Sequence, residues 1–431
     1  MYRIDAEVMI PGRGSPLSDA TVIVDGHRIS YAGPRDGAPP ESHPTVSVPV
    51  VMPGLWDCHV HFAGVREGAS TQEMMLTPAP LATARAVKDA ETLLQAGFTS
   101  VRDLGGYGVH LATAVAEGTV RGPSIYSANK VISQTGGHSD AHRLPYESVS
   151  DPCRANGMQI LADGVDECLK ATRLQLREGA RVIKVCTSGG VVSEMDDPYH
   201  RQFSDAELRA IVEEAGRADR AVAAHCHGKK GVLAAVAAGC TTIEHGSQID
   251  EETAAAIKES GAVLVPTRTI FAALHANLAV LPPHWRSKVA RLAEEHLTSM
   301  QIALSAGVPM AAGTDLGLSL PGTPLSFGRN GAEFEHLVAA GMTPLEAIEA
   351  GTAAAPATLG AQAPRSGLLA EGYDADVIAL AADPVADISV LTRPELVTHV
   401  WRRGEPVKGA HTDTTTGTID EFRRRIDTTR S

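Results

Sequence analysis

The chain has 431 residues, of which 43% are hydrophobic and 21% are charged, and its formal net charge is −13. This length suits a barrel of about 250 residues together with a second, smaller module, and the composition argues against extended disorder. The acidic balance, with no basic run anywhere, argues against a surface that binds nucleic acid or anionic membranes.

No export or membrane segment is predicted. The first residues lack a charged region followed by an apolar core, and no apolar run approaches the roughly 20 residues of a membrane helix. The cysteines are scattered, with no CxxC pair, which is typical of reduced thiols in a large protein. We therefore expect a cytoplasmic location. The cysteines are Cys58, Cys153, Cys168, Cys186, Cys226 and Cys240.

The first predicted elements are short β-strands. Residues 1–53 contain strand-like runs separated by Gly, Pro, Asp and Ser clusters. The same pattern of strand-like runs and turn residues occurs again at 372–384 and 395–407. We expect residues 1–53 and 368–411 to form a small β-sandwich domain built from both chain ends. Residues 412–431 are too polar to bury much surface and are predicted to form a peripheral tail.

Between these segments, residues 54–367 alternate between strand and helix patterns. Short runs rich in Val, Ile and Ala are followed by stretches with helical period. Such a series predicts an α/β fold, a (β/α)₈ TIM barrel. An open doubly wound sheet would normally carry GxGxxG after its first strand, and that motif is absent there. The predicted strands are GLWDCHVH, FTSVRDLGG, PSIYSANK, RVIKVCTSGG, AVAAHCHG, TTIEHGS, AVLVPTR and VPMAAGTDLG.

Metal-capable side chains lie near the carboxyl ends of five of these strands. Barrel enzymes carry their chemistry at that end, and side chains two apart on a strand share a face, so paired histidines can point together into the barrel mouth. One such histidine alone is more often structural, but convergence of all of them indicates a metal site. The residues are His59, His61, Lys184, His225, His227, His245 and Asp315.

Lys184 is the unusual member of this set. Burial and a nearby cation both favour the neutral amine of a lysine. A neutral amine can react with carbon dioxide to give a carbamate, which is an anionic oxygen ligand able to bridge two cations.

Taken together, the motifs of the chain resemble the amidohydrolase superfamily, specifically its binuclear, metal-dependent, prolidase-like branch. That branch includes Xaa-Pro dipeptidases, N-acyl amino acid carboxypeptidases, ochratoxin-type amidases and phenylurea hydrolases. The resemblance covers nearly the whole chain and implies a homo-oligomeric enzyme that hydrolyses an amide or urea C–N bond of a small molecule. The motifs are MPGLWDCHVHFAG, VRDLGG, SQTGGHSD, VIKVCTSGG, AAHCHG, TIEHGS, AAGTDLG and GYDADVIAL.

The resemblance also implies a role for each residue. His59, His61 and Asp315 would hold the more buried of two divalent ions, with zinc as the default metal. His225 and His245 would hold the outer ion, and carbamylated Lys184 would bridge the two. Asp315 would take a proton from a hydroxide shared by the ions and pass it to the leaving nitrogen, in line with general acid–base catalysis.

Two further histidines are candidates for contact with substrate. His138 lies in the glycine-flanked loop TGGHSD and is the candidate to stabilise the oxyanion, the alternative being a surface loop histidine. His227 shares a strand face with His225 and either contacts substrate or supports a metal ligand. The branch often has tyrosine there, so His227 departs from the prolidase pattern. Arg329 is a second candidate to receive a substrate carboxylate.

Two rival functions remain open. A mononuclear deaminase or imidazolonepropionase-like hydrolase on the same scaffold needs no bridging anion, so a functional Lys184 counts against it. A non-catalytic scaffold protein would typically lack several ligands, whereas every ligand position is filled here. The sequence does not identify the substrate.

Overall fold

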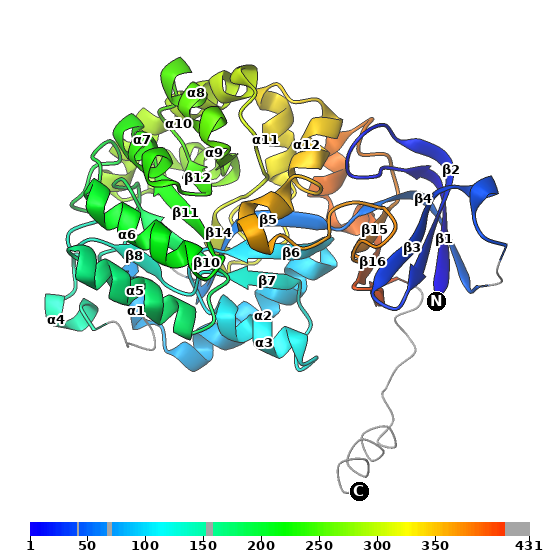
Figure 1. Ribbon diagram of the computed structural model, residues 1–431, viewed down its shortest axis with the longest axis horizontal. Coiled ribbons are helices and arrows are strands. Elements are labelled where there is room, and N and C mark those ends of the chain that lie inside the picture. The colour runs from blue at the N-terminus through cyan, green and yellow to red at the C-terminus, as the bar shows by residue number, and fades with distance from the viewer. Residues whose placement is uncertain (41–42, 67–70, 152–157, 410–431) are drawn as a thin grey trace, which may run out of the picture.

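The computed structural model describes residues 1–40, 43–66, 71–151 and 158–409. The predicted tail at 412–431 and Cys153 lie outside these described residues. Figure 1 shows a small β domain beside a larger body in which helices surround parallel strands.

The small domain is built on one seven-stranded sheet in the order β17-β16-β15-β4-β1-β2-β3. Strand β4 pairs parallel to β1 on one side and antiparallel to β15 on the other, so the two ends of the chain meet at β4. Alternating apolar residues such as Ile4, Val22, Val377 and Trp401 form its core. The strands are β1 Tyr2–Met9, β2 Leu17–Asp25, β3 Arg28–Pro34, β4 Thr45–Pro53, β15 Val377–Leu380, β16 Val397–Arg402 and β17 Glu405–Lys408.

Two parallel sheets make up the larger body, in the orders β13-β12-β11-β10-β8-β9 and β14-β5-β6-β7. Their strands are buried on both faces and rich in Val, Ile and Ala, as expected for strands covered by helices. These strands are β5 Leu55–Val65, β6 Phe98–Asp103, β7 Ser124–Ser127, β8 Val131–Ser133, β9 Gln159–Leu161, β10 Val182–Cys186, β11 Ala221–Cys226, β12 Thr242–His245, β13 Val263–Val265 and β14 Leu316–Leu318.

Backbone hydrogen bonds join these two sheets at both edges. Arg181 N–H donates to the Ser127 carbonyl at 2.8 Å and so links β10 to β7. On the other side, residues 309–312 lie between β13 and β5, because Leu264 N–H donates to the Pro309 carbonyl and Cys58 N–H to the Ala312 carbonyl. The strand regions therefore surround one core, and the chain folds as a (β/α)₈ TIM barrel.

Seven of the eight predicted strands contain a barrel strand, whereas the eighth, residues 308–317, is mostly irregular and contributes a single bridge from Met310 to Leu264 and the start of β14. The third is interrupted, since β7 is followed by β8, which pairs with β10 through Val131 and Lys184. Strand β9 was not predicted, and it adds to the edge of β8 outside the barrel ring.

The barrel helices begin and end at the expected signals. Ser204 and Thr343 form capping boxes with Glu207 and Glu346, and Gly261 ends α8 in the left-handed conformation. The helices are α1 Thr71–Leu76, α2 Ala79–Gln95, α3 Gly108–Ala116, α4 Tyr146–Val149, α5 Val165–Arg177, α6 Asp205–Gly216, α7 Lys229–Ala238, α8 Glu251–Ser260, α9 Arg268–Ala276, α10 Pro283–Ala306, α11 Ala332–Ala340 and α12 Pro344–Ala350.

None of the helices in the described ranges has the length and apolar character needed to cross a membrane. The five cysteines within those ranges are buried and make no disulfide. They pack as small apolar side chains.

Candidate metal centre

One cavity opens at the carboxyl ends of the barrel strands, and every predicted site residue lines it. The sequence separates these residues by up to 256 positions, but parallel strands bring their ends to one rim. Arg329, by contrast, is exposed and does not line this cavity. The site residues are His59, His61, His138, Lys184, His225, His227, His245 and Asp315.

We call His59, His61 and Asp315 the inner half of the site. Asp315 Oδ1 lies 3.1 Å from His61 Nε2 and 3.4 Å from His59 Nε2. Asp315 adopts φ 60° and its N–H donates to the His59 carbonyl at 2.7 Å. A non-glycine residue in this region is strained by roughly 1–3 kcal/mol, as residues at functional sites often are.

The other ring nitrogens of the inner histidines are already hydrogen-bonded. His59 Nδ1 lies 2.8 Å from Glu244 Oε2, and His61 Nδ1 lies 2.9 Å from the Gly105 carbonyl. Both partners accept hydrogen bonds, so each histidine donates from Nδ1 and keeps the lone pair on Nε2 for a ligand. This is the usual second contact of a metal-binding histidine.

We call His225, His227 and His245 the outer half. His225 Nε2 lies 3.2 Å from the Gly189 carbonyl, and the Nδ1 atoms of the other two face hydroxyl groups of Ser247 and Thr267 at 3.0 and 2.8 Å. The three histidines form one group whose ligand atoms lie within 4.8 Å of one another, and His59, His245 and Asp315 form a second. His245 therefore joins the two halves, and both His225 and His227 can reach an ion.

Burial sets the protonation of these histidines. It lowers the pKa of His59 to about 4 and lowers the pKa values of the outer-half histidines well below 6.5. Neutral imidazole is the form that binds metal. For Asp315, burial raises the pKa, but the neighbouring His59 and His61 outweigh this and hold it well below its usual value. His61 differs, because Asp315 outweighs the effect of burial and raises the pKa of this imidazole. The centre thus combines four neutral imidazoles, His61 and a carboxylate.

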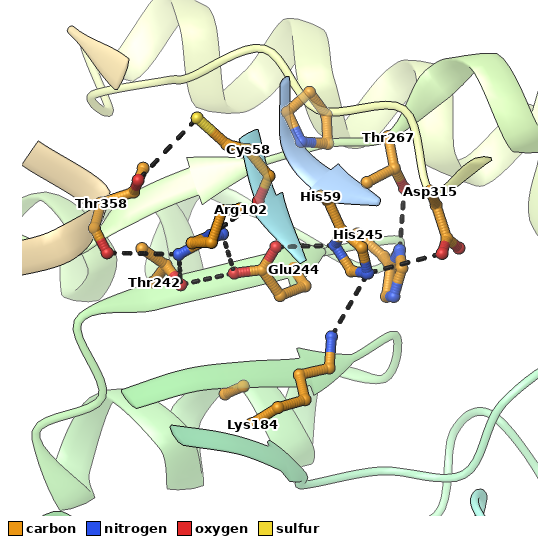
Figure 2. Close-up of polar contacts among 12 residues, drawn as sticks. Cys58, His59, Arg102, Lys184, Thr242, Glu244, His245, Thr267, Asp315 and Thr358 are labelled. Atoms are coloured by element: carbon orange, nitrogen blue, oxygen red, sulfur yellow. Dashed lines mark hydrogen bonds and ion pairs between the residues drawn. The ribbon is translucent and has the colours of Figure 1, made fainter. Parts of the chain in front are cut away.

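Lys184 lies between these groups and is only 3% exposed. Its Nζ is 3.4 Å from His59 Nε2 (Figure 2), and it makes no ion pair with any described residue. Burial lowers the pKa of its amine. The carboxylates of Glu244 and Asp315 favour the charged amine, but the loss of hydration on burial outweighs them.

His138 lies inside the cavity and is not a surface loop histidine. Its ring stacks on that of His225, with centroids 4.1 Å apart and planes 11° from parallel. Its Nδ1 is 3.0 Å from Ser193 Oγ in the loop after β10. Lys288 of α10 holds this loop by donating to the Gly190 and Ser193 carbonyls at 2.9 and 2.8 Å.

Sequence reasoning missed a buried ion pair behind His59. Arg102 Nη2 lies 2.6 Å from Glu244 Oε1, and both side chains are fully buried. The only signal was a charged residue within each of two buried strands, Arg102 in β6 and Glu244 in β12. Glu244 immediately precedes His245 and contacts His59, so this pair touches the candidate metal centre on the side of His59 opposite Asp315 (Figure 2).

A second missed carboxylate fixes the main chain of the inner half. Asp57 accepts hydrogen bonds from His59 N–H at 3.0 Å and Thr314 N–H at 3.1 Å. It therefore ties β5 to the segment that leads into Asp315. The Thr314 hydroxyl and the Asn330 side-chain amide also donate to this carboxylate, at 2.6 and 2.7 Å.

The remaining cavity wall is largely apolar. Helices α9 and α10 and the loops at the barrel mouth supply most of it, so a ligand would meet imidazoles at the base and hydrocarbon above. The apolar lining includes Met74, Val131, Met158, Val191, Val192, Ile270, Phe271, Leu274, Trp285, Leu316, Leu318 and Leu325.

The chain belongs to the amidohydrolase family, whose sequence model matches residues 50–407. It is therefore a hydrolase that acts on C–N bonds, as the strand-end motifs predicted. Family membership and the histidine–aspartate groups together support a metal-binding site.

Individual relatives confirm the predicted prolidase-like branch. The ochratoxinase of Aspergillus niger is 43% identical over 423 residues, which cover 94% of this chain and 86% of the relative. The crystal structure of that enzyme has a TM-score of 0.90 and 41% identity, covering 96% of this chain and 98% of the other. A prolidase complexed with N-methylphosphonate-L-proline has a TM-score of 0.86 and 34% identity, covering 95% and 100%.

Proposed function

We propose that the protein hydrolyses the amide bond of a small N-acyl amino acid or aryl amide that carries a large apolar group, using two divalent metal ions. The observation that carries this proposal is the meeting of four ligand histidines, one lysine and one aspartate at the base of an apolar cavity. The likeness to ochratoxinase supports ochratoxin as the first substrate to test.

The donor set suits two divalent ions. His59, His61 and Asp315 would hold the inner ion, while His225 and His245 would hold the outer one. Each of these histidines has one ring nitrogen occupied by a protein acceptor or hydroxyl and one left for a metal. Nitrogen and carboxylate ligands are those that zinc prefers, although manganese or iron also accept them. Bound ions of this kind lower the pKa of water and polarise a carbonyl group.

Lys184 would bridge the two ions as its carbamate. The neutral amine attacks carbon dioxide, a C–N bond forms, and one proton leaves to solvent. The low exposure of Lys184, its lowered pKa and its lack of an ion pair with described residues all support this reaction. The resulting anion would offset the positive charge of the ions.

Asp315 would move the proton during hydrolysis. Its carboxylate faces both inner histidines and is ionised, so it can accept a proton from the attacking water and deliver it to the leaving nitrogen. Without protonation, an amide nitrogen is a poor leaving group.

His138 and His227 would hold the substrate. When Ser193 donates to Nδ1 of His138, the Nε2–H of that ring is free to donate to the carbonyl oxygen, where negative charge develops. His227 would contact the substrate carboxylate or amide, with its ring fixed by Ser247. The apolar wall, including Phe271 and Trp285, would bind the large group.

The test is a hydrolysis screen with metal analysis on the same sample. We expect ochratoxin and N-acyl aromatic amino acids to be cleaved faster than Xaa-Pro dipeptides or phenylureas, with about two metal ions per chain. A content near one ion per chain, together with deamination of a cyclic substrate, would favour the mononuclear alternative. No cleavage of any amide by protein that holds two ions would contradict the proposal.

Three finer predictions belong to the same proposal. Zinc is the expected native metal, the protein is expected to form a homo-oligomer, and its expected location is cytoplasmic. The domain boundaries at 1–53, 54–367 and 368–411 also stay a proposal. Metal analysis of protein purified without added metal, light scattering and limited proteolysis would check them.

A further inference from the structure

We propose that Arg102 and Glu244 are positioning residues for metal binding: Arg102 fixes the carboxylate of Glu244, and Glu244 orients His59 so that its Nε2 faces the inner metal position. The inference rests on the proposed function, because it requires a metal ion in the inner half. It assigns a role to a buried ion pair that the chemistry described above does not use.

Arg102 is held in one orientation by partners from four directions. Its Nε donates to the Cys58 carbonyl at 2.6 Å, and its Nη1 donates to Thr242 Oγ1 at 3.0 Å and the Thr358 carbonyl at 3.3 Å. Nη2 is left for Glu244, at 2.6 Å. Figure 2 shows these contacts converging on the guanidinium from separate elements of the barrel. A planar group with every edge bonded cannot rotate without losing hydrogen bonds.

Glu244 passes this orientation on to His59. Its Oε1 accepts from Arg102 and from the Thr242 hydroxyl, so Oε2 alone faces the His59 ring, 2.8 Å from Nδ1. An ionised carboxylate can only accept hydrogen bonds. His59 must therefore carry its proton on Nδ1, which leaves the Nε2 lone pair directed at Asp315 and Lys184.

Stability alone does not explain this pair. Both side chains are fully buried, and the loss of hydration of two charges commonly exceeds their mutual attraction, so apolar replacements are often at least as stable. A carboxylate can fix the orientation of a metal-binding histidine through a hydrogen bond, and an apolar pair cannot do this.

The decisive variant is Glu244→Gln, which keeps the shape of the side chain but removes its charge and its acceptor-only character. We expect the affinity for one of two Zn²⁺ ions to fall about 10- to 100-fold, the range typical when the second contact of a ligand is lost. The measurement is competition for Zn²⁺ with a chromophoric chelator, with no substrate present.

A double variant separates positioning from stability. Arg102→Met alone would leave Glu244 charged and unpaired, and is expected to unfold at lower temperature. Arg102→Met combined with Glu244→Gln removes both charges. We expect the double variant to recover much of the unfolding temperature while its Zn²⁺ affinity stays low. Recovery of both quantities would mean that the pair is only structural.

The matched control is Glu333→Gln. Glu333 is also a buried carboxylate, and it accepts from the N–H groups of Arg268 and Thr269 at 2.9 and 2.8 Å, neither of which is a proposed ligand. We expect a loss of stability with Zn²⁺ affinity within about twofold of wild type. Unchanged affinity in Glu244→Gln would overturn the inference even if wild type binds two ions, whereas a wild type that binds no Zn²⁺ would overturn the proposed function and the inference with it.

Discussion

The two halves of the metal centre are held in different ways. In the inner half, His59 is oriented by the carboxylate of Glu244, and Arg102 in turn fixes that carboxylate. In the outer half, the Gly189 carbonyl fixes the proton of His225 on Nε2, but His227 and His245 are held by the hydroxyl groups of Ser247 and Thr267. A hydroxyl can donate or accept, so it does not dictate which ring nitrogen carries the proton. A carboxylate does, and the inner half is therefore the more strictly preorganised of the two.

The largest effect is expected at Lys184, which lies between the inner and outer halves of the site. Lys184→Ala removes the proposed bridge, so both ions should bind more weakly and kcat should fall by about 10⁴-fold or more. Metal analysis after dialysis and steady-state kinetics on the substrate found by the screen would check this. Wild-type metal content together with wild-type activity would exclude a bridging role for the lysine.

Asp315→Asn tests the proton path of the inner half. The amide keeps an oxygen for the metal but cannot accept a proton, so kcat is expected to fall about 10³-fold, within the usual range for general acid–base catalysis. The unfolding temperature should change little, because the side chain keeps its shape. An unchanged kcat would show that another group moves the proton.

The outer half is tested by comparing two histidines that end one strand. His225→Asn is expected to lose one metal ion, whereas His227→Asn should keep both and raise KM about tenfold, by the loss of one hydrogen bond to substrate. Metal analysis and kinetics on the two variants side by side would decide. Loss of one metal ion in His227→Asn, with only a raised KM in His225→Asn, would mean that His227 is the metal ligand and His225 contacts the substrate.

The last prediction concerns the metal-free protein, whose stability is expected to depend on pH. Burial lowers the pKa values of the outer-half histidines well below 6.5, so as the pH falls below 6.5 the unfolded chain binds more protons than the folded one. Stability must then fall as the pH falls, by up to about 1.4 kcal/mol per pH unit for each histidine.

Chemical denaturation at pH 6.5 and pH 5 would measure that slope. Replacing all three outer-half histidines by Asn should flatten it, while the contributions of Asp57 and other buried carboxyls, which are present in both proteins, cancel. Equal slopes in the two proteins would mean that these histidines titrate normally in the folded chain.

Much of this arrangement could be predicted because the signals are local. Each predicted barrel strand is a short, largely apolar run followed by a helical pattern, and the proposed ligands lie in the carboxyl-terminal halves of the predicted strands or just after them. The carboxyl ends of barrel strands meet at one rim, so ligands from separate strands are expected to lie close together there. Strand β9 was missed because three residues without alternation carry little pattern.

The ion pair between Arg102 and Glu244 could not be found in this way. The two residues are 142 positions apart, and neither lies at a turn, cap or motif with a fixed partner. A charge on an apolar strand indicates that some partner exists but not which residue it is. Only the closure of the barrel brings β6 and β12 to the same place below the cavity.

The pairing of β4 has a consequence for how the polypeptide matures. This strand is made before the barrel, yet the strand that covers its second edge, β15, is made after it. Until then the nascent chain carries an open β edge, which is a template for joining other chains. A chain that ends before Val377 would therefore lack the strand that covers this edge of β4, and we expect such a chain to aggregate.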